Sequence, residues 1–64
     1  MFKVGDLVKV LFETPRYYII IEKIPRSERG FGEQMYTLMC REDGTIRHDV
    51  RYSRIKFVGR LQDR

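Results

Sequence analysis

The sequence predicts an all-β fold, in the form of a partly open barrel of five short strands with a single 3₁₀ turn before the last strand. Two observations lead to this prediction. Short runs rich in β-branched and aromatic residues recur along the chain, and most of them end at a turn signal that contains Gly or Pro. No segment shows a sustained helical period, so no helix is expected.

The first strand is expected over residues 7–12. Val8, Val10 and Phe12 fall on one face of this segment at period two, which is typical of a half-buried strand. Pro15 then breaks the pattern, because it fixes its own φ and cannot donate to a ladder.

The second strand is expected over residues 17–24. Ile21 and Ile24 differ in parity, so burial of both requires a bulge or a sharp bend between them. If Ile19 and Ile21 point inward, Ile20 points outward. An exposed Ile20 would indicate a partner surface, and the alternative is that a loop covers it.

A loop over residues 25–33 carries Phe31 between two glycines, so this ring either meets a ligand or folds back onto the core. The third strand is expected over residues 34–41. Asp43-Gly44 at the centre of the following turn predicts a tight hairpin.

The fourth strand is expected over residues 45–50. Strict alternation along it places Ile46, His48 and Val50 on one face and Arg47 on the other. The polar stretch that follows is long enough for one 3₁₀ turn.

A short last strand is expected over residues 55–58 and is predicted to end at Gly59. The chain is therefore interpreted as a single domain over residues 1–64. Its core covers about residues 4–58, and residues 59–64 form a frayed tail.

Particular residues resemble the SH3-like small β-barrel, in a pattern similar to its KOW and Tudor-like members. The residues that carry this resemblance are Gly5-Asp6-x-Val8-x-Val10, Ile21-x-x-Ile24, Tyr36-x-Leu38, Asp43-Gly44 and Ile55-x-x-Val58. The resemblance implies a fold and no specific family, because core and turn residues are shared by many unrelated functions. The alternative small barrel, the OB-fold, would need a helix that the sequence does not offer.

Cysteine usage and hydropathy narrow the classes of function. Cys40 is the only cysteine, so no internal disulfide can form, and one Cys with one His cannot make a four-ligand zinc site. No cofactor is expected. A cytoplasmic setting is expected, because small secreted domains are usually cross-linked by disulfides.

The longest apolar run, residues 17–21, is far shorter than the roughly 20 residues of a membrane span, so no membrane partner is expected.

Charge favours an anionic partner. The net charge is +4, and the surplus lies in residues 41–64, which carry seven basic and four acidic residues. Arginine binds phosphate with its planar fork, and aromatic rings stack on bases. Tyr18 and Phe31 are further candidates for stacking. The alternative is solvated surface charge. The candidate nucleic-acid-binding residues are Arg41, Arg47, Arg51, Arg54, Lys56 and Tyr52.

Excess apolar residues favour a protein partner, since one face of so small a core cannot hold them all. Open strand edges would also accept a strand from another chain, and a homodimer is one form of such an assembly. The candidate interface residues are Ile20, Tyr18, Phe31, Met35 and Met39.

Catalysis is not expected. Cys40 and His48 lie at similar distances from the centre of the predicted hairpin, but a buried structural cysteine is the favoured interpretation, since no third orienting group is evident. The sequence therefore predicts a non-enzymatic binding module. A role in protein interaction or assembly is the first expectation, and binding of nucleic acid is the alternative.

Overall fold

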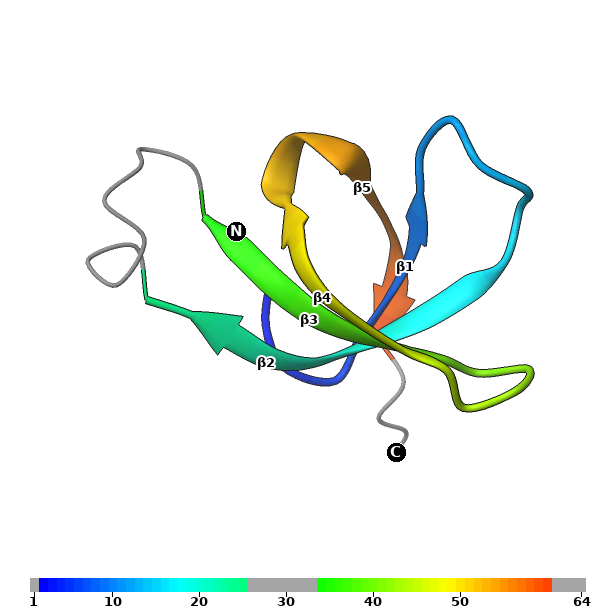
Figure 1. Ribbon diagram of the computed structural model, residues 1–64, viewed down its shortest axis with the longest axis horizontal. Helices are drawn as coiled ribbons and strands as arrows, with labels where there is room; N and C mark the ends of the chain where they lie inside the picture. Colours follow the sequence, from blue (N-terminus) through cyan, green and yellow to red (C-terminus); the bar gives the residue numbers. More distant parts are fainter. Residues whose placement is uncertain (1, 26–33, 61–64) are drawn as a thin grey trace.

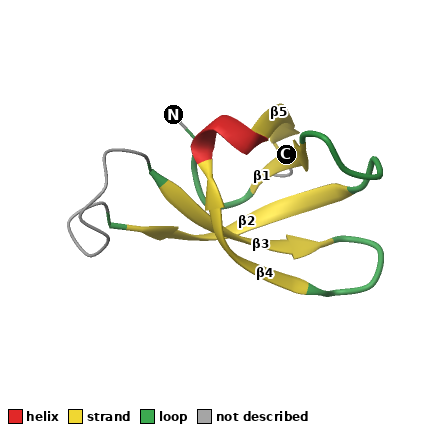
Figure 2. Ribbon diagram, turned by 45° about the horizontal axis from the view of Figure 1, so that its top comes forward, coloured by secondary structure: helices red, strands yellow, loops and turns green. Residues whose placement is uncertain are grey.

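The computed structural model describes residues 2–25 and 34–60, which form one antiparallel sheet. The elements are β1 (Asp6–Val10), β2 (Tyr17–Ile24), β3 (Met35–Cys40), β4 (Ile46–Arg51), the 3₁₀ turn η1 (Tyr52–Arg54) and β5 (Ile55–Arg60). The strand order in the sheet is β4-β3-β2-β1-β5, and the strands bend so that the sheet curls into a partly open barrel (Figure 1). The turn η1 carries the chain from β4 across to β5, which pairs with β1 (Figure 2). The predicted all-β fold with a single 3₁₀ turn is confirmed. Within 2–25 and 34–60, no helix has the length and hydropathy to cross a membrane.

The core lies on the inner face of the curled sheet. Cross-strand pairing sets this face, because Tyr18 lies opposite Cys40 and Ile20 lies opposite Leu38. Burial of these apolar side chains is the main source of stability in so small a chain. The buried cluster consists of Phe2, Val8, Val10, Tyr18, Ile20, Tyr36, Leu38, Cys40, Val50 and Ile55.

Strand β2 contains a bulge, but the bulge lies at Ile21 and not between Ile21 and Ile24 as predicted, and the facing of the strand is the reverse of the prediction. Two steps along β2, from Ile20 to Glu22, lie opposite one step along β3, so Ile21 is the extra residue. Ile20 is fully buried, whereas the side chain of Ile21 is 40% exposed. The prediction was wrong because the pairing of Ile20 with Leu38 places Ile20 on the inner face.

Strand β4 departs from the strict alternation that the sequence predicted. Tyr36 pairs with Val50 and Leu38 pairs with Arg47, so β4 has one extra residue in this interval. Asp49, with a φ of 58°, supplies the left-handed backbone for this bulge. Arg47 therefore shares the inner face with Val50, and the prediction that it points outward was wrong.

The outer strands also differ from their predicted ends. Strand β1 ends at Val10, and Phe12 has left the strand with a φ of 66° and an 88% exposed side chain. The predicted burial of Phe12 beside Val10 was therefore wrong. Strand β5 continues to Arg60, so its predicted end at Gly59 was wrong. Val58 is an extra residue between Phe57, which pairs with Val8, and Gly59, which pairs with Leu7.

The hairpin predicted around Asp43-Gly44 is confirmed. Gly44 has a φ of 77°, and its backbone N–H donates to the carbonyl of Cys40 at 2.9 Å. The Asp43 carboxylate accepts a hydrogen bond from the backbone N–H of Thr45 at 2.9 Å. This bond favours the charged carboxylate and lowers the pKa of Asp43 to about 2.

Most of the predicted protein-interface residues do not reach the surface. Tyr18 and Ile20 belong to the core, and Met35 is also buried. Met39 is half-buried on the outer face of β3, opposite Ile19. The prediction failed for Tyr18 and Ile20 because it reversed the faces of β2. Phe31 lies outside the described residues.

Replacing Ile20 and Ile21 separately with Ala tests the assigned facing of β2. We expect Ile20→Ala to lower the free energy of unfolding by about 2–5 kcal/mol, because it opens a cavity in the core. Ile21→Ala removes the same atoms from an exposed position and should cost about 0.5 kcal/mol or less. Chemical denaturation of both variants gives the comparison, and a larger loss for Ile21→Ala would contradict the register.

Candidate functional site

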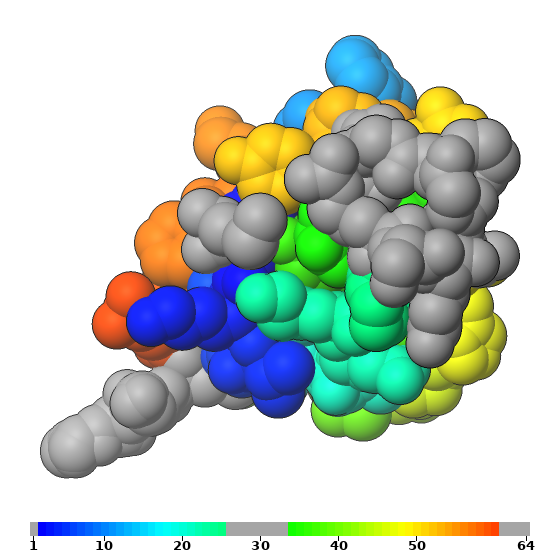
Figure 3. Space-filling model, turned by 90° about the vertical axis from the view of Figure 1, so that its left-hand side faces the viewer, coloured from blue at the N-terminus to red at the C-terminus, as the bar shows by residue number. Residues whose placement is uncertain are grey.

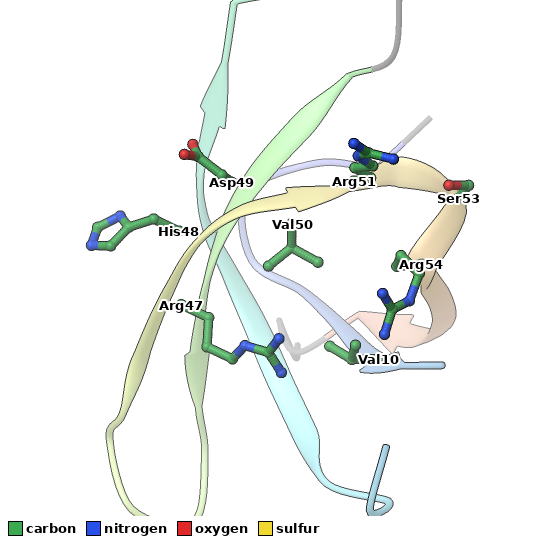
Figure 4. A pocket seen from close by; sticks show the side chains of 8 residues that line it. All are labelled: Val10, Arg47, His48, Asp49, Val50, Arg51, Ser53 and Arg54. Atoms are coloured by element: carbon green, nitrogen blue, oxygen red, sulfur yellow. The ribbon is translucent and has the colours of Figure 1, made fainter. Parts of the chain in front are cut away.

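A hollow of about 230 Å³ opens between β1, β4 and η1 (Figure 4). Val10 and Val50 form its apolar part, and Arg47 and Arg54 turn their side chains toward it. His48 points to the other side of β4. The residues that line the hollow are Val10, Arg47, His48, Asp49, Val50, Arg51, Ser53 and Arg54. Three of these eight side chains are guanidinium groups, so the hollow suits an anion.

Arg47 reaches this position because the bulge in β4 places it on the inner face. Its guanidinium lies 5.9 Å from the centroid of the Tyr18 ring, and its Nη1 donates to Oε1 of Glu13. The hydrogen bond to Glu13 raises the pKa of Arg47 above its ordinary value. The Arg47 side chain is thus held in one place and remains fully charged.

Arg54 ties η1 to the connection between β1 and β2. Its Nη2 donates to the carbonyl of Leu11 at 3.1 Å, and the backbone N–H of Leu11 donates to the carbonyl of Arg54 at 2.7 Å. The same Nη2 lies 3.6 Å from Oε2 of Glu13. The Arg54 guanidinium carbon lies 5.7 Å from the centroid of the Phe12 ring. Its Nε is buried and has no acceptor among the described residues, so the Nη atoms make its polar contacts.

Glu13 is the internal counterion of these two arginines. Hydrogen bonding from Arg47, together with the charges of Arg47 and Arg54, lowers the pKa of the Glu13 carboxyl. A carboxylate in this place takes up donor capacity that a phosphate group would otherwise use. An external anion must therefore share these donors with Glu13 or displace it.

The structure brings only some of the predicted cationic residues together. Arg51 borders the hollow beside Arg47 and Arg54, whereas Arg41 and Lys56 do not line it. Lys56 pairs with Lys9 across the two strands, on the outer face of the sheet. The predicted patch therefore divides into a hollow with three arginines and separate cations elsewhere.

Tyr52 is only partly available for stacking. Its ring lies 5.1 Å from the Phe2 ring, which also packs 5.5 Å from the ring of Tyr36. Tyr52 keeps 45% of its surface exposed, whereas Tyr18 is buried and cannot stack on a base.

Phe12 and Glu13 are the site residues that sequence reasoning missed. Alternation assigned Phe12 to the core, and the sequence pattern assigned no role to Glu13. Pro15 indicated that the strand ends nearby, because proline is confined to the edges, starts and bulges of strands, but it did not indicate that the strand ends at Val10, before Phe12. The contact between Glu13 and Arg47 joins residues 34 apart and had no signal in the sequence.

The pair of Cys40 and His48 does not form a site. Cys40 is buried on the inner face, whereas His48 is exposed and points away from the hollow (Figure 4). Among residues 2–25 and 34–60, no three or more His, Cys, Asp or Glu side chains gather as metal ligands would.

In comparisons with known proteins, no protein-family model, curated protein or solved structure matches this chain. Function is therefore inferred from the geometry of the hollow and of the sheet faces.

Glu13→Gln tests the ion pairs of the hollow through their pH dependence. The pKa of Glu13 is lowered in the folded state, so its contribution to stability is present above the ordinary value of 4.5 and is lost as the pH falls through the lowered value. We expect the wild type to exceed Glu13→Gln in free energy of unfolding by about 0.2–1 kcal/mol at neutral pH. The difference should vanish in acid. Denaturation across pH measures it, with Glu42→Gln on the exposed hairpin as the control. An equal, pH-independent stability of wild type and Glu13→Gln would contradict the pairing.

Proposed function

We propose that the chain is a non-enzymatic binding module with an SH3-like barrel, and that it binds nucleic acid through the hollow between β4 and η1. The observation that carries the proposal is the gathering of Arg47, Arg51 and Arg54 around one hollow with an apolar floor. Such a site favours phosphate groups, because each guanidinium can donate two parallel hydrogen bonds and because binding releases counterions from the nucleic acid.

The internal charge balance sets the expected conditions of binding. Glu13 already neutralises part of the charge of Arg47 and Arg54, and the whole chain carries only +4. Affinity should therefore be modest. Its salt dependence should be shallow, at about 2 log units or less per log unit of salt, because the three arginines can neutralise only a few single-strand phosphates. This proposal ranks above protein association because three of the five apolar residues expected at a protein interface are buried.

The double variant Arg47→Ala with Arg51→Ala tests this function against a charge-matched control. The control, Arg41→Ala with Lys56→Ala, removes the same charge from residues outside the hollow. The quantity compared is the slope of log affinity against log salt concentration. We expect the first variant to lower the magnitude of this slope by about 0.7 for each single-strand phosphate that the protein no longer neutralises. The control should keep nearly the full slope.

Fluorescence anisotropy across a salt series measures these slopes, and circular dichroism checks that both variants remain folded. Equal slopes for the two variants would place binding outside the hollow. No binding by the wild type even at low salt would reject the function.

Protein association remains a second candidate because of an apolar row on the outer face of the sheet. Ile46 pairs with Met39, Met39 with Ile19, and Ile19 with Leu7, so these four side chains follow one another across β4 to β1. Ile46 is exposed and the other three are half-buried. This row supports association of two copies of the chain.

Charge on either side of the row is compatible with such a dimer. Lys9 and Lys56 flank the row on one side, and Glu22 flanks it on the other. A two-fold axis along the row would therefore bring opposite charges of two copies together.

Ile46→Lys tests this second candidate, with Ile21→Lys as a control of nearly equal exposure outside the row. If the row joins two copies, sedimentation velocity should show a concentration-dependent dimer for the wild type and for Ile21→Lys. Ile46→Lys should stay monomeric, since a buried unpaired charge opposes the interface. A wild type that is monomeric at every concentration would remove this candidate.

A further inference from the structure

Phe12 combines nearly complete exposure with a strained backbone. Its side chain is 88% exposed, which exceeds the exposure of the other large apolar side chains in the described part of the chain. Its φ of 66° lies in the left-handed region, which is unfavourable for a bulky residue. Strain of this kind persists only where neighbouring contacts impose it, and it often occurs at functional positions.

The residues on both sides of Phe12 provide those contacts. Leu11 is held through its backbone N–H and carbonyl by Arg54, at 2.7 and 3.1 Å. Glu13 is held by Arg47 and Arg54. The chain is thus anchored immediately before and after Phe12, and the ring is directed into solvent. The light-blue connection between β1 and β2 stands out at the top of the surface in Figure 3.

Arg54 links this ring to the cationic hollow. Its guanidinium carbon lies 5.7 Å from the ring centroid of Phe12, and the same side chain lines the hollow. The guanidinium covers part of the ring, and the high exposure leaves the remaining surface open. A planar group stacked on Phe12 would lie next to a phosphate bound at the arginines.

We propose that Phe12 is a base-stacking platform and that the ligand of the hollow is single-stranded nucleic acid, DNA or RNA. This inference rests on the function proposed above and specifies its ligand class. A single strand can present a phosphate to the arginines and an unstacked base to the ring, which is the usual combination in single-strand binding. The bases of a duplex are stacked and paired, and thus unavailable to Phe12.

Phe12→Trp gives a direct signal, because the chain contains no other Trp. We expect its fluorescence to be quenched by oligothymidylate or oligouridylate of about 12 nucleotides, a length within the range of single-strand site sizes known for OB-fold barrels. A DNA duplex of the same length should bind with little quenching. Quenching by either single strand supports the platform, and the comparison of the two identifies the preferred sugar. Quenching by neither, or equal quenching by the duplex, would overturn it.

Phe12→Leu and Phe12→Gly test the affinity and separate it from stability. Loss of the ring should weaken single-strand binding by about 5- to 150-fold, which corresponds to about 1–3 kcal/mol. Duplex affinity should change little. Phe12→Gly should keep or raise the melting temperature, because glycine accepts a positive φ, so weakened binding would not reflect unfolding.

Tyr17→Leu is the matched control for these variants. Tyr17 is 42% exposed and also has a cationic neighbour, since Nζ of Lys9 lies 5.1 Å from its ring centroid, but it does not line the hollow. We expect this variant to bind as the wild type does. Wild-type binding that persists in Phe12→Leu and Phe12→Gly would overturn the platform while leaving the proposed function intact. A wild type that binds none of the oligonucleotides would reject both.

Discussion

The left-handed backbone of Asp49 determines which side chains of β4 face the interior of the barrel. Because one extra residue is accommodated there, Val50 and Arg47 both lie on the inner face, opposite Tyr36 and Leu38. Val50 completes the core, and Arg47 reaches across the barrel to the β1–β2 connection. With regular alternation, Arg47 would lie on the outer face and the hollow would lose one of its three arginines. Aspartate is suited to this position, since its short polar side chain tolerates a positive φ better than most residues do.

The connection between β1 and β2 keeps an aromatic ring exposed to solvent at the cost of a strained backbone. Glycine would relieve the strain at residue 12, yet the position holds a phenylalanine whose ring is almost entirely in solvent. Arg54 and Glu13 offset this strain with backbone hydrogen bonds and ion pairs on both sides of the ring. Arg54 therefore has two roles, because it anchors the loop and it lines the hollow. Arg47 shares the anchoring role through its contact with Glu13, whereas Arg54 also holds the backbone of Leu11.

Much of the fold could be predicted from the sequence, because strands and turns depend on local residue types. The bounds of β2, the hairpin at Asp43-Gly44 and the 3₁₀ turn are as expected. The facing of Ile20 and Arg47 could not be predicted, because a single bulge reverses every side chain beyond it and its position depends on cross-strand pairing. The sequence indicated the arginines of the site but did not indicate Phe12. This residue leaves the strand after Val10, and the contacts that hold its neighbours Leu11 and Glu13 come from Arg47 and Arg54, far along the chain.

Chemical-shift mapping of the ¹⁵N-labelled protein with a single-stranded oligonucleotide tests most directly whether the bulged β4, η1 and the β1–β2 connection form one binding surface. We predict that the shifted amides cluster over residues 10–13 and 47–54, and that the outer apolar row is unaffected. Shifts concentrated on Ile19, Met39 and Ile46 would contradict a single surface at the hollow, as would shifts spread evenly over the cationic residues of the whole protein.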